Sequence, residues 1–170
     1  MTATVRRHRC IALTLIVLAL PLGAAANRLP TADRVLVDKS ERMLYLLAGD
    51  DILAEFPVAL GAEPVGHKAE EGDLRTPEGR YFLGGRNPDS DFFLSIHISY
   101  PNALDRARAR EARRQPGGQI MIHGQPNEPK YSEAFYRSAD WTNGCIAVSN
   151  AAMIDIWLMT TANTPIDIQP

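Results

Sequence analysis

The sequence contains very little cysteine, and this scarcity excludes a disulfide-stabilised fold. Only Cys10 and Cys145 occur among the 170 residues, too few for the framework of bridges that holds small secreted domains together. The histidines show no zinc-ligand spacing. The chain also has no phosphate-binding loop, dinucleotide fingerprint or serine nucleophile elbow. We therefore expect no metal and no other cofactor.

Long apolar runs are scarce as well, and the one at the N-terminus, residues 11–20, is short for a transmembrane helix. Three arginines precede this run, and small residues at positions 24–26 follow it. A basic segment, a short apolar segment and an A-x-A site are typical of a secretory signal peptide. We predict a signal peptide over residues 1–26 with cleavage after Ala26, and hence an exported protein. An uncleaved membrane anchor is the alternative.

The rest of the chain has no excess of positive charge. Loss of residues 1–26 removes three arginines and leaves 15 basic against 20 acidic side chains. Overall charge therefore excludes a general polyanion binder, and we expect no nucleic-acid partner. The length fits a single hydrophobic core. We expect a short mobile lead over residues 27–33 and one domain over residues 34–170, and the sequence leaves the oligomeric state unspecified.

Short apolar runs separated by polar turns dominate the first half of this domain. We expect strands over residues 34–38, 43–47, 52–61, 80–83 and 92–100, a long functional loop over 66–79 and a turn over 84–90. Further strands are expected over residues 119–122 and 166–168, and helices over 103–114 and 151–161. The pattern predicts a mainly β fold of mostly antiparallel strands with two or three short helices.

The expected helix over residues 103–114 is strongly basic. It carries five arginines, opposed only by Asp105 and Glu111. Such a face suits an anionic polymer, although a run of charges is also typical of an ordinary solvated helix surface. Both interpretations stay open.

Cys145 and His123 are the strongest candidates for chemistry. After cleavage Cys145 would be the only cysteine, and His123 lies 22 residues upstream of it. A thiol becomes a nucleophile when a neighbouring imidazole takes its proton and stabilises the thiolate. Gly144 lets the backbone approach a bound carbonyl, so the amides of Gly144 and Cys145 would face a developing oxyanion. We predict a cysteine acyl-transfer enzyme; a buried, inert cysteine is the alternative.

Other polar and aromatic residues are weaker candidates. His97 lies on the polar face of its strand, and Tyr100 and Trp141 could stack on a sugar or peptide. His67 lies in the polar loop, either beside a substrate groove or in solvent. Residues 125–141 form a polar, aromatic-bearing excursion between His123 and Cys145.

Two segments of the sequence resemble the signature of a known family. Ile122-His123-Gly124, followed by Thr142-Asn143-Gly144-Cys145-Ile146, resembles that of the YkuD-type L,D-transpeptidases, and residues 72–79 resemble the family's Thr-Pro-x-Gly stretch. The resemblance covers residues 34–170. It implies an L,D-transpeptidase-like β-sandwich or barrel, with Cys145 as nucleophile, His123 as general base, the Gly124 carbonyl orienting the imidazole, and the Gly144 and Cys145 amides as the oxyanion hole.

The resemblance also implies a substrate and a compartment. Members of the family act on peptidoglycan stem peptides in the periplasm. They form a thioester at the meso-diaminopimelate carbonyl, release D-alanine and transfer the acyl group to an amine, and an outer-membrane lipoprotein is one candidate acceptor.

The sequence departs from the family pattern at two positions. Asn143 replaces a histidine, and Ala147 replaces an arginine that could bind a carboxylate. Either Arg75 or Arg80 could take its place, and a structural role for both is the alternative. The variant motif resembles a YafK-like branch. We expect substrate contacts from Asn143, Trp141, Arg75, Thr142, Tyr100 and His97. Besides transpeptidation, two functions stay open, namely a murein hydrolase or amidase using the same Cys-His site and a non-catalytic peptidoglycan-binding module.

Overall fold

A computed structural model of the chain describes residues 29–170. The predicted signal peptide and its cleavage site at Ala26 lie outside the described residues. None of the helices within 29–170 has the length and apolar character that crossing a bilayer requires. The end of the predicted mobile lead is fixed to the domain, because Ala32 is buried and its amide donates to the carbonyl of Met159 at 2.7 Å.

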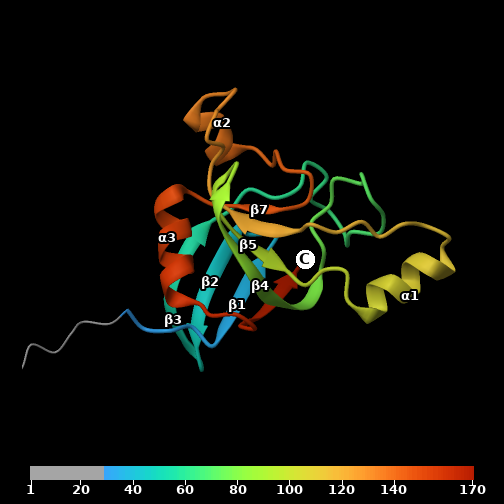
Figure 1. Cartoon of the computed structure of the whole chain (residues 1–170), viewed down its shortest axis with the longest axis horizontal. Helices are drawn as coiled ribbons and strands as arrows, with labels where there is room; N and C mark the ends of the chain where they lie inside the picture. Colours follow the sequence, from blue (N-terminus) through green and yellow to red (C-terminus); the bar gives the residue numbers. More distant parts are fainter. Residues whose placement is uncertain (1–28) are drawn as a thin grey trace, which may run out of the picture.

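The strands form one mixed sheet of eight strands in the order β3-β2-β1-β8-β4-β5-β6-β7 (Figure 1). Their bounds are β1 Arg34–Asp38, β2 Met43–Ala48, β3 Asp51–Pro57, β4 Gly79–Ser90, β5 Phe93–Ile98, β6 Met121–His123, β7 Ile146–Ala147 and β8 Pro165–Gln169. Adjacent strands are antiparallel except for the pairs β1–β8 and β6–β7. The prediction of a mainly β fold with mostly antiparallel strands is confirmed.

The long strand β4 joins the two parts of the sheet. Residues 79–82 of β4 pair with β8, and residues 83–90 pair with β5. The predicted turn over residues 84–90 is therefore wrong. Gly84, Gly85 and Pro88 give that segment a turn-like composition, but two register shifts accommodate them within the ladder as bulges.

The predicted strand over residues 52–61 is also shorter than expected. It ends at Pro57, which has no amide hydrogen to continue the ladder. The chain then makes two isolated bridges, from Ala59 to Ala147 and from Gly61 to Thr142. These bridges place the segment after β3 beside the residues that flank Cys145.

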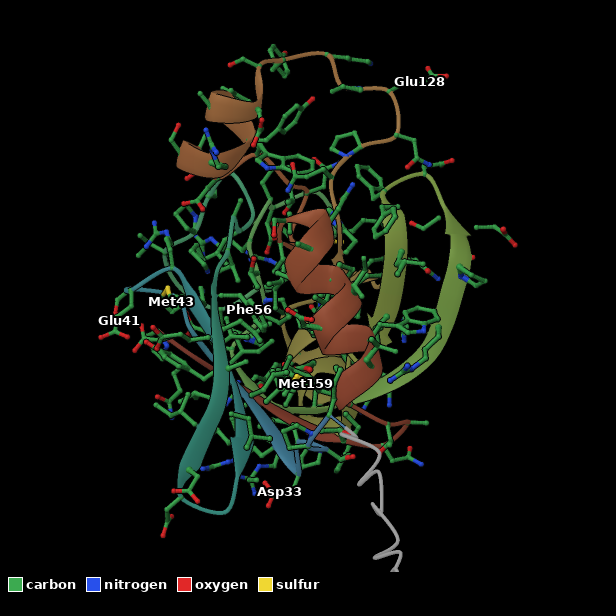
Figure 2. The ribbon with its side chains drawn as sticks, turned by 90° about the vertical axis from the view of Figure 1, so that its left-hand side faces the viewer. Asp33, Glu41, Met43, Phe56, Glu128 and Met159 are labelled. Carbon is green, nitrogen blue, oxygen red and sulfur yellow. The ribbon has the colours of Figure 1, made fainter. Side chains whose placement is uncertain are left out.

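Three short helices complete the fold: α1 (Ala103–Glu111), α2 (Glu133–Ser138) and α3 (Asn150–Met159). Two of them match the predicted helices, whereas α2 lies in the segment that the sequence analysis treats as an irregular excursion. Ser149 caps α3 by accepting a hydrogen bond from the Ala152 amide. Figure 2 shows α3, which ends at Met159, lying between the two parts of the sheet.

The core lies between α3 and the sheet. One cluster of buried residues joins Leu46 of β2, Ile98 of β5 and Ile156 of α3. The closing strand β8 lies in the middle of the sheet, between β1 and β4, and buries Ile166 and Ile168. This arrangement holds β4, β5 and β6 rigidly in register, and β6 ends at the site.

Candidate active site

His123 and Cys145 come together because β6 and β7 are adjacent parallel strands. Ile122 pairs with Ile146 and His123 pairs with Ala147. Side chains alternate along an extended chain, so Cys145 is on the same face as Ala147 and His123. Both side chains line one groove of about 1020 Å³.

The imidazole of His123 is buried and held in one orientation. Its side chain is 3% exposed, and Nδ1 lies 2.7 Å from the Gly124 carbonyl oxygen. A carbonyl only accepts hydrogen bonds, so Nδ1 carries the proton and Nε2 is an acceptor. Burial lowers the pKa of His123, and the hydrogen bond to Gly124 opposes this with a smaller effect. A buried, neutral imidazole with a free acceptor nitrogen is suited to general-base catalysis.

Aromatic rings surround this imidazole. The centroid of the Phe92 ring lies 4.5 Å from that of His123, and the Trp141 ring lies 5.7 Å away, edge to face. Tyr136 of α2 packs against Trp141 in turn, at 5.0 Å. Trp141 does not belong to the groove lining, so its observed contact is with the histidine, whereas the sequence analysis expects it to stack on substrate.

The thiol of Cys145 is placed to donate a hydrogen bond to the backbone of the groove wall. Its Sγ lies 3.6 Å from the Gln119 carbonyl oxygen, which accepts the S–H hydrogen bond. Burial raises the pKa of Cys145, while the Met121 amide and the positive charge of Lys68 oppose the increase. The S–H contact with Gln119, the raised pKa of Cys145 and the lowered pKa of His123 all favour a neutral thiol and a neutral imidazole over a preformed ion pair.

The turn before Cys145 requires glycine and contains a tight hydrogen-bonded unit. Gly144 has φ +121°, and a Cβ there would lie 2.6 Å from the Arg75 carbonyl oxygen. Its amide donates to Oγ1 of Thr142 at 3.0 Å, and that hydroxyl donates to the Cys145 carbonyl at 2.8 Å. The Gly144 amide is thus engaged within the turn instead of facing the groove, and the buried Thr142 shapes the turn instead of contacting substrate. Neither Gly144 nor Thr142 is among the residues that line the groove.

The polar loop over residues 66–79 is ordered by two buried lysines. Nζ of Lys39 donates to the carbonyls of Gly66 and Thr76 and to Glu78. Nζ of Lys68 donates to Oδ1 of Asp73 at 2.7 Å and to the Glu70 carbonyl at 3.1 Å. A long charged loop would otherwise be mobile, so these contacts fix the wall of the groove.

Lys68 is the groove residue that the sequence analysis misses. Its side chain is 3% exposed, lines the groove and lies close enough for its charge to act on Cys145. The sequence signal is a lysine followed five positions later by an aspartate in a glycine-bounded loop. This spacing alone does not predict an ion pair, because two residues five positions apart in a loop have no preferred relative geometry.

Asp73 provides a test of how this loop is held. Burial alone would raise its pKa, but hydrogen bonds from Lys68 and from the amides of Ala69, Glu70 and Arg75 lower it to about 2. The ionised carboxylate therefore stabilises the fold by about 2 kcal/mol above about pH 4, a contribution lost as pH falls through about 2. We expect Asp73→Asn to lower the free energy of unfolding, measured in urea, by about this amount at neutral pH. The free energy of unfolding of the variant should also decrease less than that of the parent protein as the pH is lowered.

The matched control is Asp50→Asn, which removes an exposed carboxylate from the β2–β3 turn. It should leave both the urea midpoint and the acid dependence unchanged. Equal behaviour of the two variants would show that the loop does not depend on Asp73.

Of the remaining predicted contacts, the structure places only Asn143 in the groove. Tyr100 is buried and its hydroxyl donates to the Pro116 carbonyl at 2.8 Å, so it holds the groove wall from behind. His97 packs beside Gly84. The exposed Arg75 side chain lies by Gly66 and does not line the groove, so it does not replace the family arginine.

His67 lies outside the groove and joins the polar loop to α1. Its Nδ1 accepts from the Glu78 amide at 3.0 Å, and Nε2 lies 3.2 Å from Oδ1 of Asp105. Oδ2 of Asp105 accepts from the Tyr81 hydroxyl at 3.0 Å. Within residues 29–170, no group of three or more His, Cys, Asp or Glu side chains is arranged to hold a metal ion.

Comparison with known proteins gives consistent matches for this fold and site. Residues 32–168 match the YkuD family, described as the L,D-transpeptidase catalytic domain. The protein named "Putative L,D-transpeptidase YafK" from Escherichia coli (strain K12) is 30% identical, over 68% of this chain and 55% of its own length.

Two solved structures are also similar. The helical cell shape determining protein Pgp2 from Campylobacter jejuni is 26% identical with a TM-score of 0.62, covering 79% of this chain and 46% of Pgp2. Bd1075 from Bdellovibrio bacteriovorus is 27% identical with a TM-score of 0.55, covering 83% of this chain and 51% of that one. The chain thus spans about half the length of these relatives.

Proposed function

The chain belongs to the L,D-transpeptidase catalytic-domain family, and from this premise we propose that it is an exported, periplasmic cysteine L,D-transpeptidase acting on peptidoglycan stem peptides. The observation that carries the proposal is the pairing of His123 and Cys145. An imidazole with its proton fixed on Nδ1 lines the same groove as a half-buried, free thiol. A module that only binds peptidoglycan would need neither feature.

The first half of the reaction forms a thioester. Nε2 of His123 takes the proton of the Cys145 thiol, and Sγ attacks the carbonyl at the L-centre of meso-diaminopimelate. The oxyanion of the tetrahedral intermediate accepts a hydrogen bond from the Cys145 amide, since the Gly144 amide is bonded to Thr142. The imidazolium returns the proton to the leaving amine, and D-alanine departs.

The second half of the reaction releases the enzyme. An amine of a second stem peptide, or of an outer-membrane lipoprotein, attacks the thioester while His123 takes its proton, and the thiol reforms. Water in place of the amine would give hydrolysis at the same site. The groove of about 1020 Å³ is large enough for an extended peptide.

Lys68 supplies the positive charge in this groove. Removal of the thiol proton creates a thiolate, and the attack then creates an oxyanion. The Lys68 ammonium is paired with Asp73, but its charge still lowers the pKa of Cys145 and so favours both anions over the neutral resting state. This role compensates in part for Ala147, which stands where the family has an arginine.

The test uses defined muropeptides. The full chain is incubated with disaccharide-tetrapeptides, and the products are separated and identified by mass spectrometry. A transpeptidase gives free D-alanine together with cross-linked dimers in equal amounts. Tripeptides with no dimers would indicate hydrolysis in place of transfer. Unchanged tetrapeptide, with the protein folded and its thiol reduced, would reject both enzymatic functions.

A further inference from the structure

Helix α1 has a surface that the catalytic site does not use. In Figure 1 it extends from the body of the domain, away from the sheet and α3. Its buried residues are Asp105 and Ala109. A capping box closes its N-terminus, in which Asn102 accepts from the Asp105 amide and Asp105 accepts from the Asn102 amide, and Asp105 also binds Tyr81 and His67 of the domain. It contributes little apolar surface to the core.

The exposed part of this helix and its C-terminal extension carries arginines at positions 106, 108, 110, 113 and 114. We call these five residues the α1 arginine surface. Within the helix, Arg106 and Arg110 are four positions apart, a spacing at which like charges destabilise a helix by a few tenths of a kcal/mol. Arg108 and Arg110 lie in the last turn, where positive charge favours the helix dipole, but this effect does not account for Arg106, Arg113 or Arg114.

Few acidic groups neutralise the α1 arginine surface. Arg114 lies 3.5 Å from Glu70, and both side chains are about half exposed, so this pair adds little. Asp105 is buried and already bonded to Tyr81 and His67. Glu111 is the other acidic residue of the helix. A net positive surface therefore remains on a domain whose overall charge is negative.

The α1 arginine surface is continuous with the groove. Residues 115–119, which follow Arg114 in the chain, line the groove that contains Cys145. The carbonyl of Gln115 accepts from the Glu71 amide at 2.8 Å, which fixes this connection to the polar loop. If one peptide of a branched polymer occupies the groove, neighbouring parts of the same polymer would therefore lie next to α1.

The chemistry of the surface selects one kind of partner. Guanidinium groups bind carboxylates in a planar, two-pronged geometry. A helix that inserts into a membrane surface needs an apolar face beside its basic one, and here Leu104 is the large hydrophobic side chain exposed on α1. An anionic polymer therefore fits better than a lipid bilayer.

We propose that the α1 arginine surface binds carboxylates of peptidoglycan strands next to the stem peptide that occupies the groove. This inference rests on the proposed function, because that function supplies the polymer. The surface would hold the enzyme on intact sacculi through several weak, salt-sensitive contacts, separately from recognition of the scissile peptide.

The experiment measures sedimentation of the full chain with purified sacculi at low and high salt. The variant is Arg106→Gln with Arg110→Gln, and the matched control is Lys130→Gln with Arg137→Gln, which removes the same charge from the segment around α2. We expect the α1 variant to bind about tenfold more weakly at low salt, with the difference lost at about 1 M salt. The control should bind like the parent protein.

Two further measurements identify the ligand of the α1 arginine surface and test this inference separately from the proposed enzymatic function. Sacculi with chemically amidated carboxylates should bind the parent protein as weakly as they bind the α1 variant. Acylation of Cys145 by a carbapenem should be equal in all proteins, since α1 does not touch the thiol. If the parent protein is not acylated, the proposed enzymatic function is rejected, while the inference about α1 is still judged by sedimentation. Equal sedimentation of the two variants, or preference for anionic lipid vesicles over sacculi, would overturn the inference about α1.

Discussion

The Cys145→Ala variant is expected to gain no mass when treated with a carbapenem, whereas the parent chain gains the mass of one drug molecule. A carbapenem is a strained acyl donor, and Cys145 is the thiol that lines the groove with His123. Removal of a covalent nucleophile abolishes the acyl-enzyme, and turnover should fall by at least about 10³-fold. Intact-protein mass spectrometry measures the adduct directly.

The second cysteine of the sequence provides the matched control. Cys10→Ala should keep the full adduct, because Cys10 belongs to the predicted signal peptide. Alanine retains the Cβ of Cys145 and so should preserve the hydrogen bonds of the preceding turn, which circular dichroism and thermal unfolding can verify. An adduct on a folded Cys145→Ala protein would place the nucleophile elsewhere and refute the assignment.

The His123→Gln variant is expected to lose about 10²–10⁴-fold in the rate of acylation at neutral pH. The side chain would still fill the buried site but could not take a proton from Cys145. Because burial raises the pKa of that thiol, only a small fraction of thiolate would form without a base. Stopped-flow measurement of carbapenem ring opening gives the rate.

The pH profile separates loss of the base from a merely structural effect. Burial lowers the pKa of His123, so the parent enzyme should keep its rate down to pH values below the ordinary histidine range, and lose it in more acidic solution as the imidazole is protonated. The acylation rate of the His123→Gln variant should instead rise about tenfold per pH unit until the pH reaches the raised pKa of the thiol. The rates of the variant and of the parent enzyme should therefore converge in alkaline solution.

His97→Gln is the control for this measurement, since His97 lies on the neighbouring strand and outside the groove lining. Its profile should match that of the parent. A His123→Gln variant that stays slow at every pH would indicate that the substitution disturbs the groove, and general-base catalysis would then need a separate demonstration.

The motif residues could be identified from sequence because the chemistry itself demands unusual residues. Glycine precedes Cys145, and His123 stands between an apolar run and Gly124, so both residues stand out from their surroundings in the sequence. The alternating apolar runs similarly identified β1, β2, β5 and β8, because burial of one sheet face leaves a period-two pattern. The family and the mainly β fold followed from these local signals.

The errors came where tertiary contacts override local composition. Residues 84–90 contain the glycines and proline of a turn, yet pairing with β5 keeps them in a bulged strand. Tyr100 and Trp141 are aromatic residues at the ends of segments, and only their neighbours determine whether they face substrate, the core or His123. No local pattern encodes those neighbours.

The sequence by itself determined the nucleophile and base candidates, the fold class and the family, because each depends on residue types at short spacing. The tertiary structure decided how the site operates. The parallel pairing of β6 with β7 aligns His123 and Cys145 on one face, and the turn at Thr142 takes the Gly144 amide out of the groove. Long-range packing also buries Lys68 in the wall of the groove that contains the thiol. Charge stabilisation depends on distance and on exclusion of water, which only the folded chain defines.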